Sequence, residues 1–197
     1  KNKRIERDNI VVRFFFFFWD GMQLTGVQFS DTTAFLGNDL STFPDFPSEI
    51  RAPSGTIAGV SAFQVHFGSN EVYTPGDKWD VLVAMNAAAL KTDLSRLKPD
   101  GIIIANSAGF DRKNLNLANY AEGVNPLEDC SLDSYTVYPI DFNKLTAESL
   151  KDIPLQSKEI ARSKNMFVLG LLFSIFDKSL DYTISAIKDK FKSQTEI

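Results

Sequence analysis

Cysteine and histidine are almost absent from this sequence of 197 residues, which holds one of each, Cys130 and His66. One cysteine excludes a disulfide within the chain and an iron–sulfur or zinc site built from several of its own thiolates. One histidine cannot hold a zinc ion without further nitrogen or sulfur ligands. The chain therefore lacks the residues for a zinc or iron–sulfur centre built on its own cysteines and histidines, and its single thiol is typical of a reducing compartment.

Long apolar runs and an excess of positive charge are also missing. The longest apolar runs, at 166–176 and 14–19, are far shorter than the roughly 20 residues that cross a bilayer. Residues 1–9 are mainly polar and do not resemble a signal peptide. The net charge is −4, and no basic face of the kind that binds nucleic acid is evident. We therefore expect a cytoplasmic protein that binds neither membranes nor nucleic acid.

Short apolar runs alternate with helical patterns along the chain, which is typical of a mostly parallel sheet covered by helices. The apolar content of 44% is enough for one core. We predict one α/β domain. The predicted strands are 10–18, 61–67, 79–85, 101–106 and 135–142, and the predicted helices are 20–37 (capped by Asp20), 86–97, one that begins at 146, 166–176 and 182–191.

Some expectations are more local. Residues 42–55 are rich in proline, which breaks helices and sheet ladders, so we expect no regular structure there. We predict a long irregular segment at 110–133. The strand 61–67 should have one face that is more exposed to water than the other. The last helix should turn Ile184, Ile187 and Phe191 inward.

The first turn between a strand and a helix has no glycine where a phosphate-binding loop would need one. In α/β sheets this turn is usually glycine-rich, so that backbone N–H groups can approach a phosphate. Here the residues from Phe15 to Trp19 are five consecutive aromatics, which cannot supply such a backbone. An independent nucleotide-binding oxidoreductase is therefore disfavoured.

The proline-rich segment carries the strongest local signal for binding. Ser48, Glu49 and Arg51 lie between prolines, which restrict the backbone. The guanidinium could bind a phosphate or carboxylate while Glu49 orients it. Alternatively, the Glu–Arg pair only holds the loop together, and the residues alone leave both interpretations open.

No catalytic set is evident elsewhere. Asp77 and Lys78 follow a Pro-Gly turn and are expected to be an exposed pair. Neither Ser54 nor Ser107 belongs to a recognisable nucleophile motif, and His66 on an alternating strand is expected to be structural. We predict no catalytic and no metal-binding residues in this chain.

Several blocks of sequence, taken together, resemble the gamma domain of 2-oxoacid:ferredoxin oxidoreductases. They resemble most the 2-oxoglutarate type, in which this domain is fused at the start of the alpha subunit. Pro47-Ser-Glu-Ile-Arg51 is the most specific piece. The blocks, in family order, are Asp20-Gly-Met-Gln-Leu-Thr-Gly26, the stretch 37–53, Gly59-Val-Ser-Ala-Phe-Gln64, the stretch 75–84 and Lys164-Asn-Met-Phe-Val-Leu-Gly170.

The resemblance implies a three-layer α/β/α domain over residues 1–197, as a fragment or one subunit of a larger enzyme. Such an enzyme decarboxylates a 2-oxoacid with thiamine diphosphate, passes electrons through a [4Fe–4S] cluster to ferredoxin, and forms an acyl-CoA. The thiamine and cluster sites belong to the alpha domain and beta subunit, which are the implied partners. The gamma domain is associated with coenzyme A.

The same resemblance suggests where this chain would bind coenzyme A. Arg51 would contact an anionic group, Glu49 would orient the loop, and the head of the first helix would add polar contacts. The alternative is a subunit-interaction module with no ligand of its own. One departure from the family is that a Ser-Gly-Asp-Ser-Gly-like stretch is replaced by the aromatic run. The predicted binding residues are Gly21, Gln23, Thr25, Ser48, Glu49 and Arg51.

Overall fold

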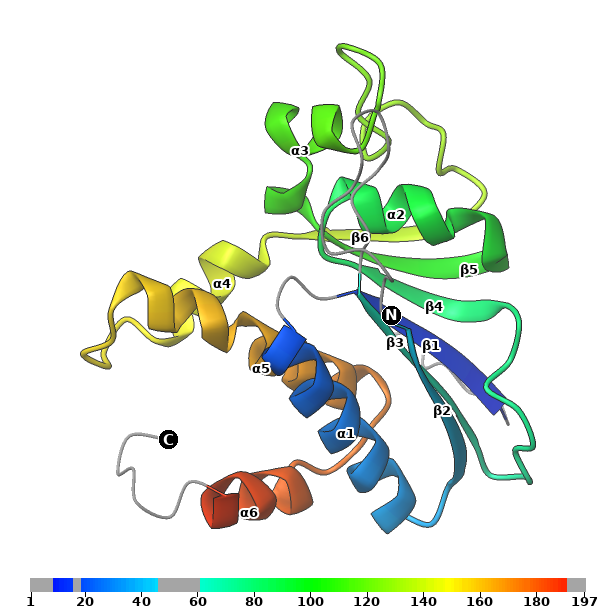
Figure 1. Ribbon diagram of the computed structural model, residues 1–197, viewed down its shortest axis with the longest axis vertical. Coiled ribbons are helices and arrows are strands. Elements are labelled where there is room, and N and C mark those ends of the chain that lie inside the picture. The colour runs from blue at the N-terminus through cyan, green and yellow to red at the C-terminus, as the bar shows by residue number, and fades with distance from the viewer. Residues whose placement is uncertain (1–8, 16–18, 46–60, 191–197) are drawn as a thin grey trace.

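Six strands form one sheet in the computed structural model, which describes residues 9–15, 19–45 and 61–190 (Figure 1). The side chains of 19–23 and 190 are outside this description. The strand order across the sheet is β2-β3-β1-β4-β5-β6. The strands are β1 (Asn9–Phe15), β2 (Asp39–Asp45), β3 (Ala62–Gly68), β4 (Trp79–Ala84), β5 (Leu97–Asn106) and β6 (Thr136–Ile140).

The sheet is parallel from β1 to the β6 edge and antiparallel toward the β2 edge. The pairs β1–β4, β4–β5 and β5–β6 are parallel, whereas β3 runs antiparallel to both β1 and β2. The predicted mostly parallel α/β fold is confirmed. The α-helices are α1 (Trp19–Phe35), α2 (Ala87–Asp93), α3 (Arg112–Leu117), α4 (Phe142–Ser149), α5 (Ser157–Ile175) and α6 (Asp181–Lys190), with short 3₁₀ turns at Leu94–Arg96 and Ser107–Gly109.

Helices α1 and α5 cover one face of the sheet through an aromatic core (Figure 1). Phe29 of α1 is fully buried. Its ring centroid lies 5.4 Å from that of Phe14, 5.5 Å from that of Phe67 and 5.6 Å from that of Phe173. Aromatic pairs at such separations stabilise the core beyond the area they bury. One side chain therefore joins two strands and two helices.

Helix α2 lies on the opposite face with α3, which completes the three layers (Figure 1). Asn86 caps α2, because its side chain accepts a hydrogen bond from the backbone N–H of Ala89 at 2.8 Å. Ala87, Ala89 and Leu90 are buried. The small alanines let α2 lie close to the strands beneath it.

The expectation of irregular structure at 42–55 is wrong for its first four residues. Strand β2 ends at Asp45 and contains Pro44. A proline is tolerated there because β2 is an edge strand, which has one side without a ladder to break. Residues 46–60 lie outside the described residues.

Three helical expectations also change. The predicted irregular segment 110–133 contains α3, whose first turn is capped by Asp111. Helix α4 begins at Phe142 rather than at 146, because Asp141 accepts a hydrogen bond from the N–H of Lys144. Ile184 is 44% exposed rather than inward-facing. Thr183 is buried in its place, with its hydroxyl 2.7 Å from that of Thr32.

The starts of α1 and α5 differ from the predicted limits. Helix α1 begins at Trp19, so Asp20 lies in its first turn rather than at the cap. It ends as expected before Gly37, whose φ of 82° stops the helix. Helix α5 has 19 residues and begins nine residues before the predicted 166. No helix in the described ranges is both long and apolar enough to span a bilayer.

Gly26 and Gly170 provide a matched test of helix packing on this face. A Cβ at Gly26 would lie 2.5 Å from Cγ of the Phe63 ring, whereas a Cβ at Gly170 would meet nothing within 4 Å. We expect Gly26→Ala to lower the free energy of unfolding by about 1–3 kcal/mol through overpacking. Gly170→Ala should raise it by up to about 1 kcal/mol through helix propensity. Urea unfolding of both variants measures this, and equal effects would contradict the packing.

Candidate functional site

The carboxyl ends of β1 and β4 form the switch point of the sheet. These parallel strands are neighbours, yet α1 after β1 covers one face and α2 after β4 covers the other (Figure 1). In open α/β sheets, ligands bind beyond the carboxyl ends of the strands at such a point. The candidate site is therefore this edge of the sheet, beyond Phe15 and Ala84, and we call it the switch edge.

The strand register places the described residues that flank the two selected stretches at the switch edge. Asp45, the last residue of β2, pairs with Ala62 at the start of β3, and Ala62 pairs with Phe15 at the end of β1. The chain therefore leaves the sheet at Asp45 and re-enters it at Ala62, both at the carboxyl end of β1. Ser48, Glu49 and Arg51 themselves lie outside the described residues.

The head of α1 adds less than the sequence suggested. Gly21 and Gln23 lie in the first two turns of α1, and their side chains are outside the description. Thr25 is only 1% exposed, so the domain itself covers its side chain. The first four N–H groups of a helix have no partner within the helix and favour an anion. Any contact from this element is therefore expected from its first turn rather than from Thr25.

Strands β4, β5 and β6 are tied together at the same edge. Nδ2 of Asn106 donates to the carbonyl of Met85 at 3.3 Å, and its Oδ1 accepts from the N–H of Phe142 at 3.1 Å. A Cβ at Gly109 would lie 2.2 Å from the carbonyl oxygen of Met85, so only glycine fits there. These contacts fix the carboxyl ends of the three strands relative to one another.

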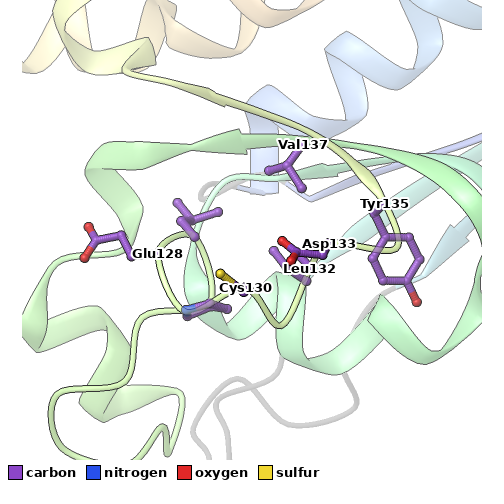
Figure 2. A pocket seen from close by; sticks show the side chains of 8 residues that line it. Glu128, Cys130, Leu132, Asp133, Tyr135 and Val137 are labelled. Atoms are coloured by element: carbon purple, nitrogen blue, oxygen red, sulfur yellow. The ribbon is translucent and has the colours of Figure 1, made fainter.

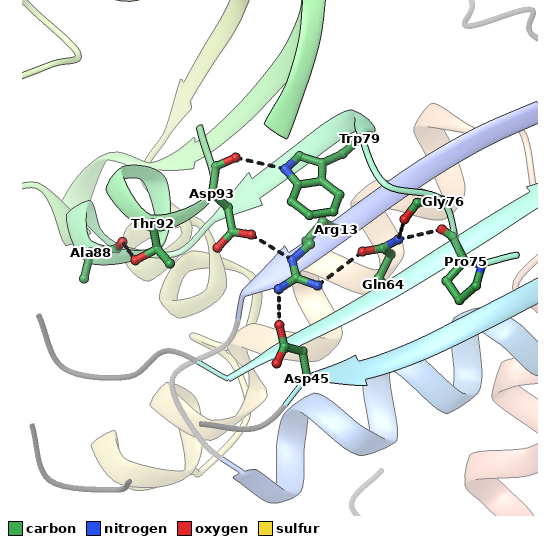
Figure 3. Close-up of polar contacts among 9 residues, drawn as sticks. All are labelled: Arg13, Asp45, Gln64, Pro75, Gly76, Trp79, Ala88, Thr92 and Asp93. Carbon is green, nitrogen blue, oxygen red and sulfur yellow. Dashed lines mark hydrogen bonds and ion pairs between the residues drawn. The ribbon is translucent and has the colours of Figure 1, made fainter. Parts of the chain in front are cut away.

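A buried arginine lies next to this edge, on the α2 face of the sheet (Figure 3). Arg13 of β1 is 4% exposed. Its NH2 group pairs with Oδ2 of Asp45, its Nε lies 3.1 Å from Oδ1 of Asp93, and its NH1 donates to Oε1 of Gln64 at 3.2 Å. Its guanidinium carbon lies 4.7 Å from the ring centroid of Trp79. We call Arg13, Asp45, Gln64, Trp79 and Asp93 the Arg13 cluster.

The cluster is held in place by its own hydrogen bonds (Figure 3). The amide nitrogen of Gln64 donates to the carbonyls of Pro75 at 2.5 Å and Gly76 at 2.7 Å. The indole N–H of Trp79 donates to the carbonyl of Asp93 at 3.0 Å. Gln64 is 2% exposed, so the expectation that one face of β3 is more exposed to water is wrong. The amide of Gln64 can be buried because its polar atoms are hydrogen-bonded.

The Arg13 cluster was not found by sequence reasoning, although a signal existed. Arg13 interrupts the apolar run of β1, and a charge in a buried strand needs partners.

A second cation overlooked in the sequence is Lys164 of α5, which contacts the start of α4, just after β6. Nζ of Lys164 donates to Oδ1 of Asn143 at 2.6 Å. Burial lowers the pKa of Lys164, while the charge of Asp141 opposes that shift.

A cavity of about 310 Å³ lies elsewhere, at the amino end of β6 (Figure 2). Glu128, Cys130, Asp133 and Tyr135 are among its lining residues. Because it precedes β6, it is not at the switch edge, and none of the predicted binding residues lines it. Within 9–15, 19–45 and 61–190, no group of three His, Cys, Asp or Glu side chains is arranged to hold a metal ion.

Residues 20–197 match the family described as pyruvate ferredoxin/flavodoxin oxidoreductase. The chain is also 43% identical, over 190 residues, to the 2-oxoglutarate oxidoreductase subunit KorA of Mycobacterium tuberculosis. This chain belongs to the pyruvate ferredoxin/flavodoxin oxidoreductase family. The alignment covers 96% of the chain but only 29% of KorA. The resemblance inferred from the sequence blocks is confirmed, and the relatives are oxidoreductase subunits.

Solved structures of this oxidoreductase family share the fold. The 2-oxoglutarate:ferredoxin oxidoreductase of Magnetococcus marinus, with 2-oxoglutarate, coenzyme A and succinyl-CoA bound, has a TM-score of 0.69 at 25% identity, covering 97% of this chain and 29% of that one. A keto/oxoacid ferredoxin oxidoreductase gamma subunit of Geobacter sulfurreducens has a TM-score of 0.59 at 15% identity, covering 93% of this chain and 85% of that one. The pyruvate oxidoreductase subunit PORC of Thermotoga maritima has a TM-score of 0.55 at 14% identity, covering 94% of this chain and 86% of that one. The last two show the fold alone.

Asp93 gives a test of the Arg13 cluster in this oxidoreductase domain. Burial raises the pKa of Asp93, although the guanidinium of Arg13 opposes the shift. A carboxyl whose pKa is raised by folding contributes stability below its ordinary pKa and loses it as pH rises through the folded value. Asp93→Asn removes this loss. We expect the free energy of unfolding of the variant, relative to native protein, to increase between about pH 4 and pH 7.

Urea unfolding of both proteins at the two pH values checks this expectation. A relative stability that stays constant, or that falls with rising pH, would mean that Asp93 is not held in an environment that penalises its charge.

Proposed function

We propose that this chain is the gamma-type accessory domain of a 2-oxoacid:ferredoxin oxidoreductase, in which it supports coenzyme A binding and subunit assembly. The proposed reaction is the coenzyme A-dependent oxidative decarboxylation of 2-oxoglutarate to an acyl-CoA. The observation that carries the proposal is the 43% identity to the 2-oxoglutarate oxidoreductase subunit KorA over nearly the whole chain. Since the chain spans 29% of KorA, the chemistry is proposed for the assembled enzyme and not for this domain alone.

The switch edge has the chemistry to hold part of coenzyme A. The structure from Magnetococcus marinus, which shares this fold, was solved with coenzyme A bound. The ligand carries phosphates, for which the first turn of α1 offers backbone N–H groups without a partner inside the helix and the positive end of a helix dipole. Arg51, on the segment that starts and ends at this edge, would supply a charged donor.

The other cofactors of the proposed enzyme do not fit this chain. Cys130, its only cysteine, is exposed and cannot by itself hold a [4Fe–4S] cluster. The described residues form no cation site that would hold the metal ion of a diphosphate cofactor. Thiamine diphosphate and the cluster are therefore proposed to bind in the alpha domain and the beta subunit, and ferredoxin to take electrons from the complex.

Exposed apolar side chains support the assembly role and also favour the alternative of a pure interaction module. Phe35, at the end of α1, is 70% exposed and stacks on Tyr182 of α6 with centroids 4.9 Å apart. Leu36, which follows Phe35, is 44% exposed, and Leu180 and Ile184, two residues to either side of Tyr182, are 42% and 44% exposed. Apolar side chains gathered on a surface often mark a contact with another protein. An interaction module would account for this apolar surface without any bound ligand.

Arg51→Ala in the assembled enzyme tests the ligand role. Losing a charge-assisted hydrogen bond to a phosphate should raise the KM for coenzyme A by about 10-fold or more. The KM for the 2-oxoacid should stay unchanged. Steady-state assays with each substrate varied in turn measure both values. The control is Arg112→Ala, because Arg112 of α3 is exposed and is paired with the exposed carboxylate of Glu122.

An unchanged KM for coenzyme A would remove Arg51 from the site. Calorimetric titration of the complex with coenzyme A then decides between the two roles. If binding is the same for the native complex and for one with Ser48, Glu49 and Arg51 all replaced by alanine, the interaction module is the better description.

A further inference from the structure

We propose that Arg13 and Asp45 are positioning residues, which hold the end of β2 so that the segment following it starts at the coenzyme A edge. This rests on the proposed function, because coenzyme A is the ligand whose binding the arrangement would serve. Neither residue is proposed to touch the ligand.

The position of the guanidinium is set by elements other than β2. Arg13 belongs to β1, its partner Gln64 to β3, Trp79 to β4, and Asp93 ends α2. The ring of Phe15 adds a further contact, with its centroid 5.3 Å from the guanidinium carbon. These groups fix the cation in the interior of the domain, whatever the edge strand does.

Asp45 reaches this fixed cation from the edge of the sheet. It is the last residue of β2, and β2 has a ladder on one side only, with β3. Its side chain is 44% exposed, in contrast to 5% for that of Arg13. The pair therefore spans β3 and ties the end of an edge strand to the centre of the sheet (Figure 3). A charge-assisted bond with one rigid partner limits where the flexible partner can lie.

Charge compensation alone does not require Asp45. Arg13 already has a buried carboxylate 3.1 Å away in Asp93, so a second one adds a negative charge to the cluster. What Asp45 adds is its location, one residue before the segment that carries Ser48, Glu49 and Arg51. Removing it should leave Arg13 paired and the core intact while releasing the end of β2.

Asp39 offers a matched control at the opposite end of the same strand. Its Oδ2 accepts a hydrogen bond from the N–H of Val72 at 2.7 Å, so it also anchors β2 to a neighbouring segment. It pairs with Gly68, at the far end of β3 from the switch edge. Asp39→Asn therefore perturbs the same strand by the same chemical change, away from the proposed ligand.

The first experiment measures hydrogen exchange by mass spectrometry on the assembled enzyme. We expect Asp45→Asn to speed the exchange of amides near the ends of the strands at the switch edge, at 42–45 and 62–64. Asp39→Asn should leave them unchanged, and Asp45→Glu, which keeps the charge, should stay closer to native. If exchange at these amides is the same in Asp45→Asn and native enzyme, Asp45 does not position the strand and the proposal is overturned.

The second experiment measures kinetics on the same enzymes. Asp45→Asn should raise the KM for coenzyme A by about 10-fold, since misplaced binding groups weaken contact with their ligand. Neither the KM for 2-oxoglutarate nor the kinetics of Asp39→Asn should change. An unchanged KM for coenzyme A in Asp45→Asn, alongside a raised KM in Arg51→Ala, overturns the positioning role and leaves the proposed function standing. If Arg51→Ala and the triple alanine variant both leave coenzyme A binding unchanged, the proposed function fails instead.

Discussion

The buried charge of Arg13 is the constraint that connects the parts of this domain. A guanidinium inside a sheet costs several kcal/mol unless its charge is paired. Asp93 from α2 supplies the buried carboxylate, Gln64 from β3 accepts a hydrogen bond, and Asp45 adds a second carboxylate from the edge strand. Strands on the antiparallel side are thereby linked to a helix that covers the parallel side. A chain that misplaced α2 would leave the guanidinium without its buried carboxylate.

The pairing of Arg13 also affects the switch edge, where the positions of the strand ends matter more than their contribution to the stability of the fold. The ends of β4, β5 and β6 are fixed through Asn106 and the close approach of Gly109. On the antiparallel side, the Arg13–Asp45 pair ties the end of β2 to β1. One edge of the sheet is thus held by hydrogen bonds between strand ends on one side and by an ion pair on the other.

The aromatic run that ends β1 is partly explained by the two cores. Phe14 and Phe15 point to opposite faces and are 0% and 2% exposed, so each fills the core on its own side. Alternation in a strand requires this of any two adjacent residues. The first two aromatics are therefore ordinary core residues, and a glycine at either position would leave a cavity.

Strong local patterns made much of the fold predictable from the sequence. The apolar run of β4 and the positive φ required at Gly37 are properties of a few adjacent residues, and both predictions hold. The prediction of irregular structure at Pro44 was wrong because a strand can contain a proline where it lies at the edge of a sheet. Whether β2 lies at the edge is decided only by the assembled sheet. The Arg13 cluster was missed because two of its partners lie 32 and 51 residues away. For the site, the contacts of Gly21, Gln23, Thr25, Ser48, Glu49 and Arg51 with a ligand stay predictions, since Ser48, Glu49 and Arg51 lie outside the described residues.

The two proposed roles, ligand support and assembly, are compatible because α1 separates them. The helix has 17 residues and is therefore roughly 25 Å long. Its first turn lies at the switch edge, whereas Phe35 and the exposed apolar side chains next to α6 lie at its other end (Figure 1). A partner that covers Phe35 and Tyr182 would not need to occupy the switch edge. Substitutions at one end should then affect assembly without changing affinity for coenzyme A, so one domain can serve both purposes.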